Sequence, residues 1–166
     1  MPISSEKFRD ALRHFPSGVT VVTIQTPTDE PPHGLTVSAF ASVSPEPPIV
    51  LIAIDHRASA NEMLAQEGTV FAVNILAQDQ METSNRFAWL KDQDRFAVGD
   101  WDTAVTGAPI LKDALAWLDC KIYERHPAGT HTIYLGEVVA SDVPRPDEAP
   151  LVYWNRGYRC LQKPPK

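Results

Sequence analysis

Most apolar residues of this sequence lie in short runs that have the length of β-strands and are separated by proline, glycine and charged residues. Residues 19–24 (VTVVTI) and 49–54 (IVLIAI) are β-branched or apolar at every position, which is typical of strands buried on both faces. Residues 117–126 and 130–142 alternate instead, and the PAG turn between them indicates a hairpin. Further strands are expected in residues 34–44, 69–76 and around 155–157. With 15 prolines to make turns, the sequence predicts a mainly β fold of roughly seven strands.

Helical signals are few. Ser4 or Ser5 can cap a helix whose apolar residues recur at helical spacing, namely Phe8, Ala11, Leu12 and Phe15. A short helix is expected within residues 55–66, and a helix followed by irregular structure over residues 78–102. Because several strands look buried on both sides, a closed or partly open barrel fits this pattern, and a sandwich is the alternative. No glycine-rich loop joins a strand to a helix, so the sequence does not indicate a Rossmann unit.

Charge and composition argue against several classes of protein. The 15 basic and 21 acidic residues give a net charge of -6, whereas a nucleic-acid surface needs clustered lysine and arginine, so we expect no nucleic-acid partner. The start of the sequence lacks the features of a signal peptide, and no apolar run is long enough to span a membrane. Cys120 and Cys160 are far apart and are expected to be reduced packing thiols. These features favour a cytoplasmic protein with no membrane partner.

Two kinds of catalytic site find little support. His126 and His131 are separated by a predicted turn, and no cysteine or carboxylate cluster completes a set of metal ligands, so no metal site is expected. A GxSxG motif for a serine hydrolase is missing as well.

Residues 34–50 (GLTVSAFASVSPEPPIV) separate hydroxyl groups from small apolar side chains. In a strand, alternate residues share a face. One face would carry Thr36, Ser38, Ser42 and Ser44, and the other Val37, Ala39, Ala41 and Val43. Exposure to solvent accounts for the hydroxyls. A bound ligand is the other interpretation. The small apolar side chains would let another layer approach one face, and the hydroxyls and backbone N–H groups would contact a flat polar heterocycle. Both interpretations stay open at this point.

Five segments resemble, in the same order, the short flavin reductases of two-component monooxygenases. They are GLTVSAFASVSPEPPIVLIAI, DHRASANEML, TVFAVNIL, GTHTIYLGEV and APLVYWNRGYR, and the resemblance extends from Phe8 to about Leu161. It implies a single flavin reductase-like domain over residues 1–166 with the flavin-binding split barrel fold, a Greek-key β-barrel. It also implies a homodimer with flavin near the subunit interface. The resemblance therefore favours a barrel over a sandwich.

The resemblance implies where FMN or FAD would bind. Thr36, Val37, Ser38 and Ala39 would lie along the flavin, and Ser42, Val43 and Ser44 would approach its ring and ribityl chain. Small side chains let backbone donors come close to the ring, whose reduced form develops negative charge.

Four further residues are candidates for this site. Arg57 and Ser59 would bind the flavin phosphate ahead of a short helix, although a solvated charge and a helix cap are the alternatives. Asn74 lies inside an apolar run and needs a partner, either a backbone group or the cofactor. Tyr158, with Tyr153, would shape the pocket or simply pack as an aromatic residue.

His131 is the candidate catalytic residue. In the resemblance, the segment GTHTIYLGEV places His131, Gly136 and Val138 at family positions and assigns His131 to the nicotinamide. Thr130 stands where Asp is common in the family. This departure removes a carboxylate that could orient the imidazole or raise its pKa.

The resemblance implies an NAD(P)H-dependent flavin reductase. It would pass a hydride from NADH or NADPH to FMN or FAD and supply reduced flavin to a partner oxygenase. A flavoprotein with tightly bound FMN that acts in electron transfer, or a flavin-binding barrel without catalysis, are the alternatives. The sequence chooses neither between FMN and FAD nor between NADH and NADPH.

Overall fold

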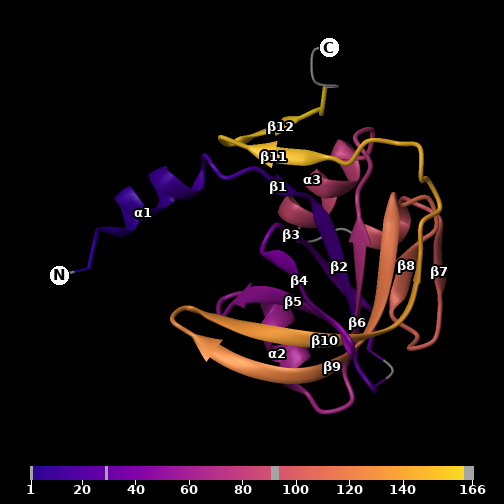
Figure 1. Ribbon diagram of the computed structural model, residues 1–166. Coiled ribbons are helices and arrows are strands. Elements are labelled where there is room, and N and C mark those ends of the chain that lie inside the picture. The colour runs from indigo at the N-terminus through magenta and orange to yellow at the C-terminus, as the bar shows by residue number, and fades with distance from the viewer. Residues whose placement is uncertain (1, 29, 91–93, 163–166) are drawn as a thin grey trace.

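The computed structural model describes residues 2–28, 30–90 and 94–162, and one antiparallel sheet of seven strands dominates it (Figure 1). These strands are β2 (Thr20–Gln25), β3 (His33–Val37), β4 (Phe40–Pro45), β5 (Pro48–Asp55), β6 (Val70–Ile75), β9 (Ala116–Ala128) and β10 (His131–Asp142). Their order in the sheet is β3-β2-β6-β9-β10-β5-β4. The predicted mainly β fold is confirmed, including the long hairpin of β9 and β10.

The two edges of this sheet are neighbours in sequence. β3 and β4 end the strand order, yet only Ser38 and Ala39 separate them along the chain. Strands in a flat sheet lie about 4.8 Å apart, so the edges would be roughly 29 Å from each other. The three peptide steps from Val37 to Phe40 span at most about 11 Å. The sheet must therefore curl until its edges face each other. Its described residues form no β3–β4 ladder, so the barrel has an open seam.

Helices and short strands surround the barrel. The helices are α1 (Ser5–Leu12), α2 (Ser59–Ala65) and α3 (Met81–Trp89), with a 3-10 turn, η1 (Arg95–Ala97). One small sheet contains β1 (Ser17–Gly18), β11 (Val152–Trp154) and β12 (Gly157–Arg159), and another contains β7 (Trp101–Thr103) and β8 (Pro109–Leu111). In Figure 1, α1 extends away from the rest of the fold. No helix of the described residues is long and apolar enough to cross a membrane.

Two apolar clusters stabilise the barrel from inside and outside. The inner cluster includes Val22, Ile52 and Phe71, and the outer cluster, which lies against α3 and β8, includes Val21 and Phe87. Because Val21 and Val22 are neighbours on β2, this strand contributes to both clusters and is buried on both faces. This burial was predicted from the unbroken β-branched run.

Residues 34–44 fall in two strands, β3 and β4, so the single strand predicted for them is wrong. The chain leaves one edge of the barrel after β3 and joins the other edge at β4. A bulge between Ser42 and Ser44 then interrupts the alternation of side chains. Thr36 contacts α3, whereas Ser42 and Ser44 lie on the opposite edge strand. The hydroxyl groups therefore border the seam from two strands instead of forming one row.

Candidate active site

A pocket of about 560 Å³ lies where β3, α2 and α3 meet, and we call it the central pocket. Its lining residues are His33, Leu35, Thr36, Arg57, Ala58, Ser59, Phe87, Ala88 and Arg95. The volume is typical of small-molecule sites. Two arginines and a histidine favour an anionic ligand, and Leu35 and Phe87 provide an apolar wall.

Close packing of β3 against α3 builds this pocket. Gly34 makes it possible, because a Cβ atom there would lie 2.5 Å from Cε1 of Phe87. Two residues further along β3, the Thr36 hydroxyl donates to the Ser84 carbonyl of α3 at 2.6 Å. Thr36 is therefore fixed in the pocket wall with its hydroxyl proton already used, and its oxygen can still accept a hydrogen bond.

A smaller pocket of about 160 Å³ adjoins the central pocket at Thr36 and Ala88, which line both. We call it the tyrosine pocket, after Tyr153 and Tyr158. The Tyr158 hydroxyl contacts Ser84 Oγ at 2.8 Å and donates to Asn85 Oδ1 at 2.9 Å, which holds the β11–β12 hairpin on α3. Tyr158 lines this pocket and packs edge-on against Tyr153 at 5.4 Å between ring centroids, and its part in flavin binding stays a prediction.

Arg57 and Ser59 both line the central pocket, as their predicted phosphate role requires. The Arg57 side chain is 90% exposed, and its guanidinium pairs with the Asp55 carboxylate at 2.7 Å. These hydrogen bonds hold the pKa of Asp55 well below its usual range. Ser59 does not cap α2, because the N-cap residue is Ala58. Its hydroxyl instead lies 3.4 Å from Nε2 of His33.

Arg95 is a second cation of the central pocket. Its Nε donates to the Leu90 carbonyl at 2.7 Å, and its Nη1 donates to the Gly34 carbonyl. Within the described ranges, no carboxylate lies at ion-pair distance from this guanidinium. Burial lowers the pKa of Arg95, and burial followed by the charge of Arg95 lowers the pKa of His33. An anionic ligand would balance this positive charge, with which no carboxylate of the described residues pairs.

His131 lines a third hollow, of about 690 Å³, which we call the His131 pocket. Its lining residues are Ser5, Phe8, Arg9, Asp55, His56, Arg57, Gly129, Thr130 and His131. The Thr130 hydroxyl lies 2.9 Å from Nδ1 of His131 and so restrains the imidazole. Asp55 stands opposite His131 in the β5–β10 ladder, which brings a carboxylate to this position from another strand.

The central pocket and the His131 pocket meet at Arg57, which lines both. The predicted phosphate-binding residues and the predicted nicotinamide residue therefore lie in adjoining hollows, although more than seventy residues separate Arg57 from His131 in sequence. The β5–β10 pairing brings them together.

Apart from Asn74, five of the predicted flavin-binding residues lie outside these pocket linings. Val37 is buried in the barrel core, so its side chain faces away from the seam. Ala39, Ser42 and Val43 are exposed and Ser44 is partly exposed, all next to or on the edge strand β4. Their part in flavin binding stays a prediction.

Asn74 belongs to the core. It is fully buried, its amide nitrogen donates to the Val21 carbonyl at 3.1 Å, and its amide oxygen accepts from Leu111 N at 2.8 Å. Of the two partners considered for Asn74, the backbone is the one observed. We therefore assign Asn74 to the packing of β2 and β8 and not to the cofactor.

The sequence did not point to His33, Arg95 or Asp55. His33 follows a proline-rich stretch that reads as a loop, and Arg95 lies in a segment of mixed charge. The available signal was the His33-Gly34 pair directly before the hydroxyl segment, since glycine inside a strand often marks a close approach of another element.

Comparisons with known proteins identify the family of this chain. The profile of the family described as "Flavin reductase like domain" matches residues 12–162. The chain is 38% identical over 160 residues to the reductase component of FADH(2)-dependent resorcinol hydroxylase from Rhizobium sp. (strain MTP-10005), covering 96% of this chain and 88% of that protein. It is 40% identical over 159 residues to flavin reductase (NADH) from Kitasatospora aureofaciens, covering 94% of this chain and 81% of that protein.

A solved structure extends the similarity to the fold. The NADH:FAD oxidoreductase of Streptomyces globisporus C-1027, in complex with NAD and FAD fragments, superposes with a TM-score of 0.85 at 33% identity, covering 98% of this chain and 98% of that one. The split barrel predicted from the sequence is confirmed by this similarity together with the open seam. The chain therefore belongs to the flavin reductase-like domain family.

Proposed function

We propose that this protein is an NAD(P)H-dependent flavin reductase that reduces FMN or FAD and releases the reduced flavin to a partner oxygenase. The observation that carries the proposal is the junction of the central pocket and the His131 pocket at Arg57. A reaction between two cofactors needs two adjoining sites, and holding the cofactors side by side supplies most of the catalysis.

The chain's own residues suit a flavin at the seam. Arg57, Arg95 and Ser59 offer two cations and a hydroxyl to the phosphate. Thr36 to Ala39 would follow the flavin from the β3 edge, and Ser42, Val43 and Ser44 would approach it from the β4 edge. These side chains are small, so backbone groups on both sides of the seam could reach the ring. Tyr158 would close the side of the flavin site that faces the tyrosine pocket.

His131 would position the nicotinamide. The Thr130 hydroxyl restrains its ring, and Arg57 stands between this ring and the central pocket. When bound, the flavin accepts a hydride from C4 of the reduced nicotinamide, and that chemistry belongs to the cofactors. The protein needs no general acid or base for this step, which agrees with the missing dyad or triad in the sequence.

Release of reduced flavin to an oxygenase is supported by the relative from Rhizobium, which is named as a reductase component. The alternatives are a flavoprotein that retains FMN and acts in electron transfer, and a barrel that binds flavin without turnover. Gel filtration distinguishes the first alternative from the proposed reductase, because a prosthetic flavin would stay with the protein.

We further propose a homodimer. Phe8 and Leu12 lie four residues apart on α1, which has no buried residue, and Phe15 follows the helix; each of the three is at least half exposed. Edge strand β4 is exposed as well, with Val43 half accessible. Apolar surface of this kind marks a protein contact, and a second copy would cover it beside the seam.

Residues 1–166 are proposed to form one domain that works in the cytoplasm. The chain length suits one core. Cys120 and Cys160 are both free thiols, which agrees with a reducing compartment.

Anaerobic mixing of the protein with flavin and NADH tests the role of His131. The wild type should bleach the visible absorbance of the flavin. His131→Ala should need about tenfold more NADH for the same rate, because it loses one positioning contact. The matched control is His126→Ala, on the same hairpin, where the exposed side chain pairs with Glu124 Oε2 at 2.7 Å. Equal rates for both variants at low NADH would contradict the assignment of His131.

A further inference from the structure

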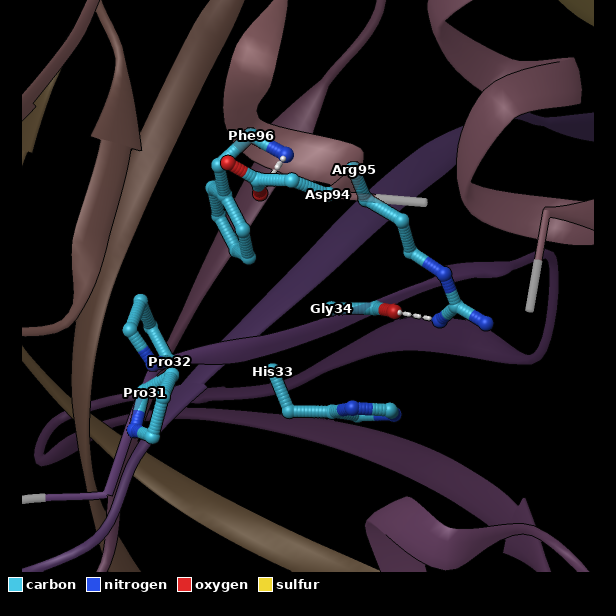
Figure 2. Close-up of a pocket in the computed structure, with 7 residues that line it drawn as sticks. All are labelled: Pro31, Pro32, His33, Gly34, Asp94, Arg95 and Phe96. Atoms are coloured by element: carbon cyan, nitrogen blue, oxygen red, sulfur yellow. Dashed lines mark hydrogen bonds between the residues drawn. The ribbon is translucent and has the colours of Figure 1, made fainter. Parts of the chain in front are cut away.

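A second pocket of about 560 Å³ adjoins the central pocket (Figure 2). We call it the proline pocket, and its lining residues are Pro31, Pro32, His33, Gly34, Asp94, Arg95 and Phe96. His33 and Arg95 line both pockets and so stand at their junction. The proposed function accounts for the central pocket and the His131 pocket but gives no ligand to this one.

We infer that the proline pocket binds the adenosine half of FAD, with the diphosphate at the His33–Arg95 junction, so that this protein prefers FAD to FMN. The inference rests on the proposed function, because it needs the flavin phosphate in the central pocket.

The junction has the chemistry of a diphosphate site. Two donors of Arg95 hold the Leu90 and Gly34 carbonyls, which fixes the guanidinium and leaves the N–H groups of Nη2 for a ligand. The His33 ring and the Arg95 guanidinium extend toward the same side of Gly34 in Figure 2. FAD places a second phosphate here and FMN does not, so these donors distinguish the two flavins.

The other side of the proline pocket suits a purine nucleoside. Pro31, Pro32 and the Phe96 ring lie across Gly34 from the charged groups (Figure 2). Phe96 is held by edge-on contacts with Phe87, at 5.2 Å, and with Trp101, at 4.9 Å between ring centroids. A fixed flat ring of this kind favours stacking of a base.

Asp94 adds a contact for the ribose. Its Oδ1 accepts a hydrogen bond from Phe96 N at 2.9 Å, and its second oxygen remains for a ribose hydroxyl. A carboxylate that binds the ribose of an adenosine is a recurring element of dinucleotide sites.

NADH and NADPH carry an adenosine diphosphate group too, but the order of the pockets favours FAD. The proline pocket shares residues with the central pocket, and the central pocket shares Arg57 with the His131 pocket. The proline pocket and the His131 pocket have no lining residue in common. A nicotinamide at His131 would therefore have to place its adenosine across the flavin site.

Calorimetric titration of the purified protein with FMN, FAD and ADP-ribose tests the inference without turnover. We expect FAD to bind about tenfold more tightly than FMN, the effect of one stacked base and one further phosphate. Phe96→Leu should lower the affinity for FAD about tenfold and leave FMN unchanged. The matched control is Phe71→Leu, the same change in the barrel core, which should leave the ratio of the two affinities as in the wild type.

Equal affinities for FMN and FAD in the wild type, or an equal loss of both in Phe96→Leu, would overturn the inference and leave the reductase proposal standing. So would a loss of ADP-ribose binding in Phe96→Leu with FAD affinity unchanged, because the pocket would then belong to the nicotinamide dinucleotide. A protein that binds neither flavin would overturn the proposed function itself.

Discussion

At the scale of single residues, several side chains serve the fold and the site together. Thr36 lines two pockets while its hydroxyl ties β3 to α3. Arg95 lines the central pocket and the proline pocket while it holds the carbonyls of Leu90 and Gly34. Truncating such residues changes stability and binding at once. Conservative replacements, with a control variant elsewhere, are therefore needed to separate the two effects.

The two cysteines should differ sharply in reactivity. Burial, followed by the charge of Asp119, raises the pKa of the Cys120 thiol to about 12, whereas Cys160 is exposed. We expect one thiol per native chain to react with a disulfide reagent at pH 8, and none in Cys160→Ser until the protein is unfolded. Because the folded pKa is raised, the stability that Cys120 contributes is complete below about pH 8.5 and declines as pH rises. Rapid reaction of two thiols per native chain with the reagent would contradict this assignment.

Gly136 is expected to tolerate no side chain. A Cβ atom there would lie 2.4 Å from Cζ of Phe71 and 3.1 Å from Cβ of Cys120. Gly136→Ala should lower the free energy of unfolding in urea by about 1–3 kcal/mol, as overpacked cores do. Gly18→Ala is the control, since its Cβ would meet nothing within 4 Å. The double variant Gly136→Ala with Phe71→Leu should lose less stability than the sum of the single variants, and strict additivity would argue against the clash.

At the scale of elements, the seam decides where the site lies. β3 and β4 are joined by two residues but belong to opposite edges of the sheet, and among the described residues no ladder joins them across the seam. α3 and the β11–β12 hairpin cover the β3 side through Ser84 and Tyr158. The β4 edge has no such cover in the described part of the chain. This asymmetry leaves a surface on which a flat ligand and a second subunit can both be placed.

Asn74 should matter for stability and not for flavin binding. Asn74→Ala would leave the Val21 carbonyl and the Leu111 N–H buried without their partner. We expect a loss of about 2–4 kcal/mol in the free energy of unfolding, measured with urea, because each unsatisfied group costs about 1–3 kcal/mol. The flavin affinity of the folded fraction should be unchanged. A weaker flavin affinity with an unchanged free energy of unfolding would contradict this assignment and indicate that Asn74 belongs to the cofactor site.

The elements could be predicted from the sequence wherever side-chain periodicity alone decides them. The β-branched run of β2 and the alternating hairpin of β9 and β10 are examples. Residues 34–44 show the limit of this approach, because the alternation continues through Ser38 and Ala39 although the chain changes edges there. Only the closure of the whole barrel imposes that change. His33 and Arg95 were missed for the same reason, since distant elements bring them together at the pocket.

At the scale of the whole molecule, α1 leaves Phe8 and Leu12 half exposed, and the proposed homodimer would cover them. Size-exclusion chromatography with light scattering should give the mass of two chains. Leu12→Glu places a charge in the exposed apolar face of α1 and should shift the protein to a monomer. The control is Lys7→Glu, which introduces glutamate on α1 outside that face and should leave the dimer intact. A wild-type protein with the mass of one chain at micromolar concentration would contradict the homodimer.

The central claim is that the pockets joined at Arg57 hold a flavin and a nicotinamide for hydride transfer. Its most direct test is the aerobic oxidation of NADH and of NADPH by the purified protein, first without flavin, then with FMN, then with FAD. The proposed function predicts oxidation that requires added flavin and saturates with it, at a lower concentration of FAD than of FMN. No oxidation under any of these conditions would contradict the assignment as a reductase.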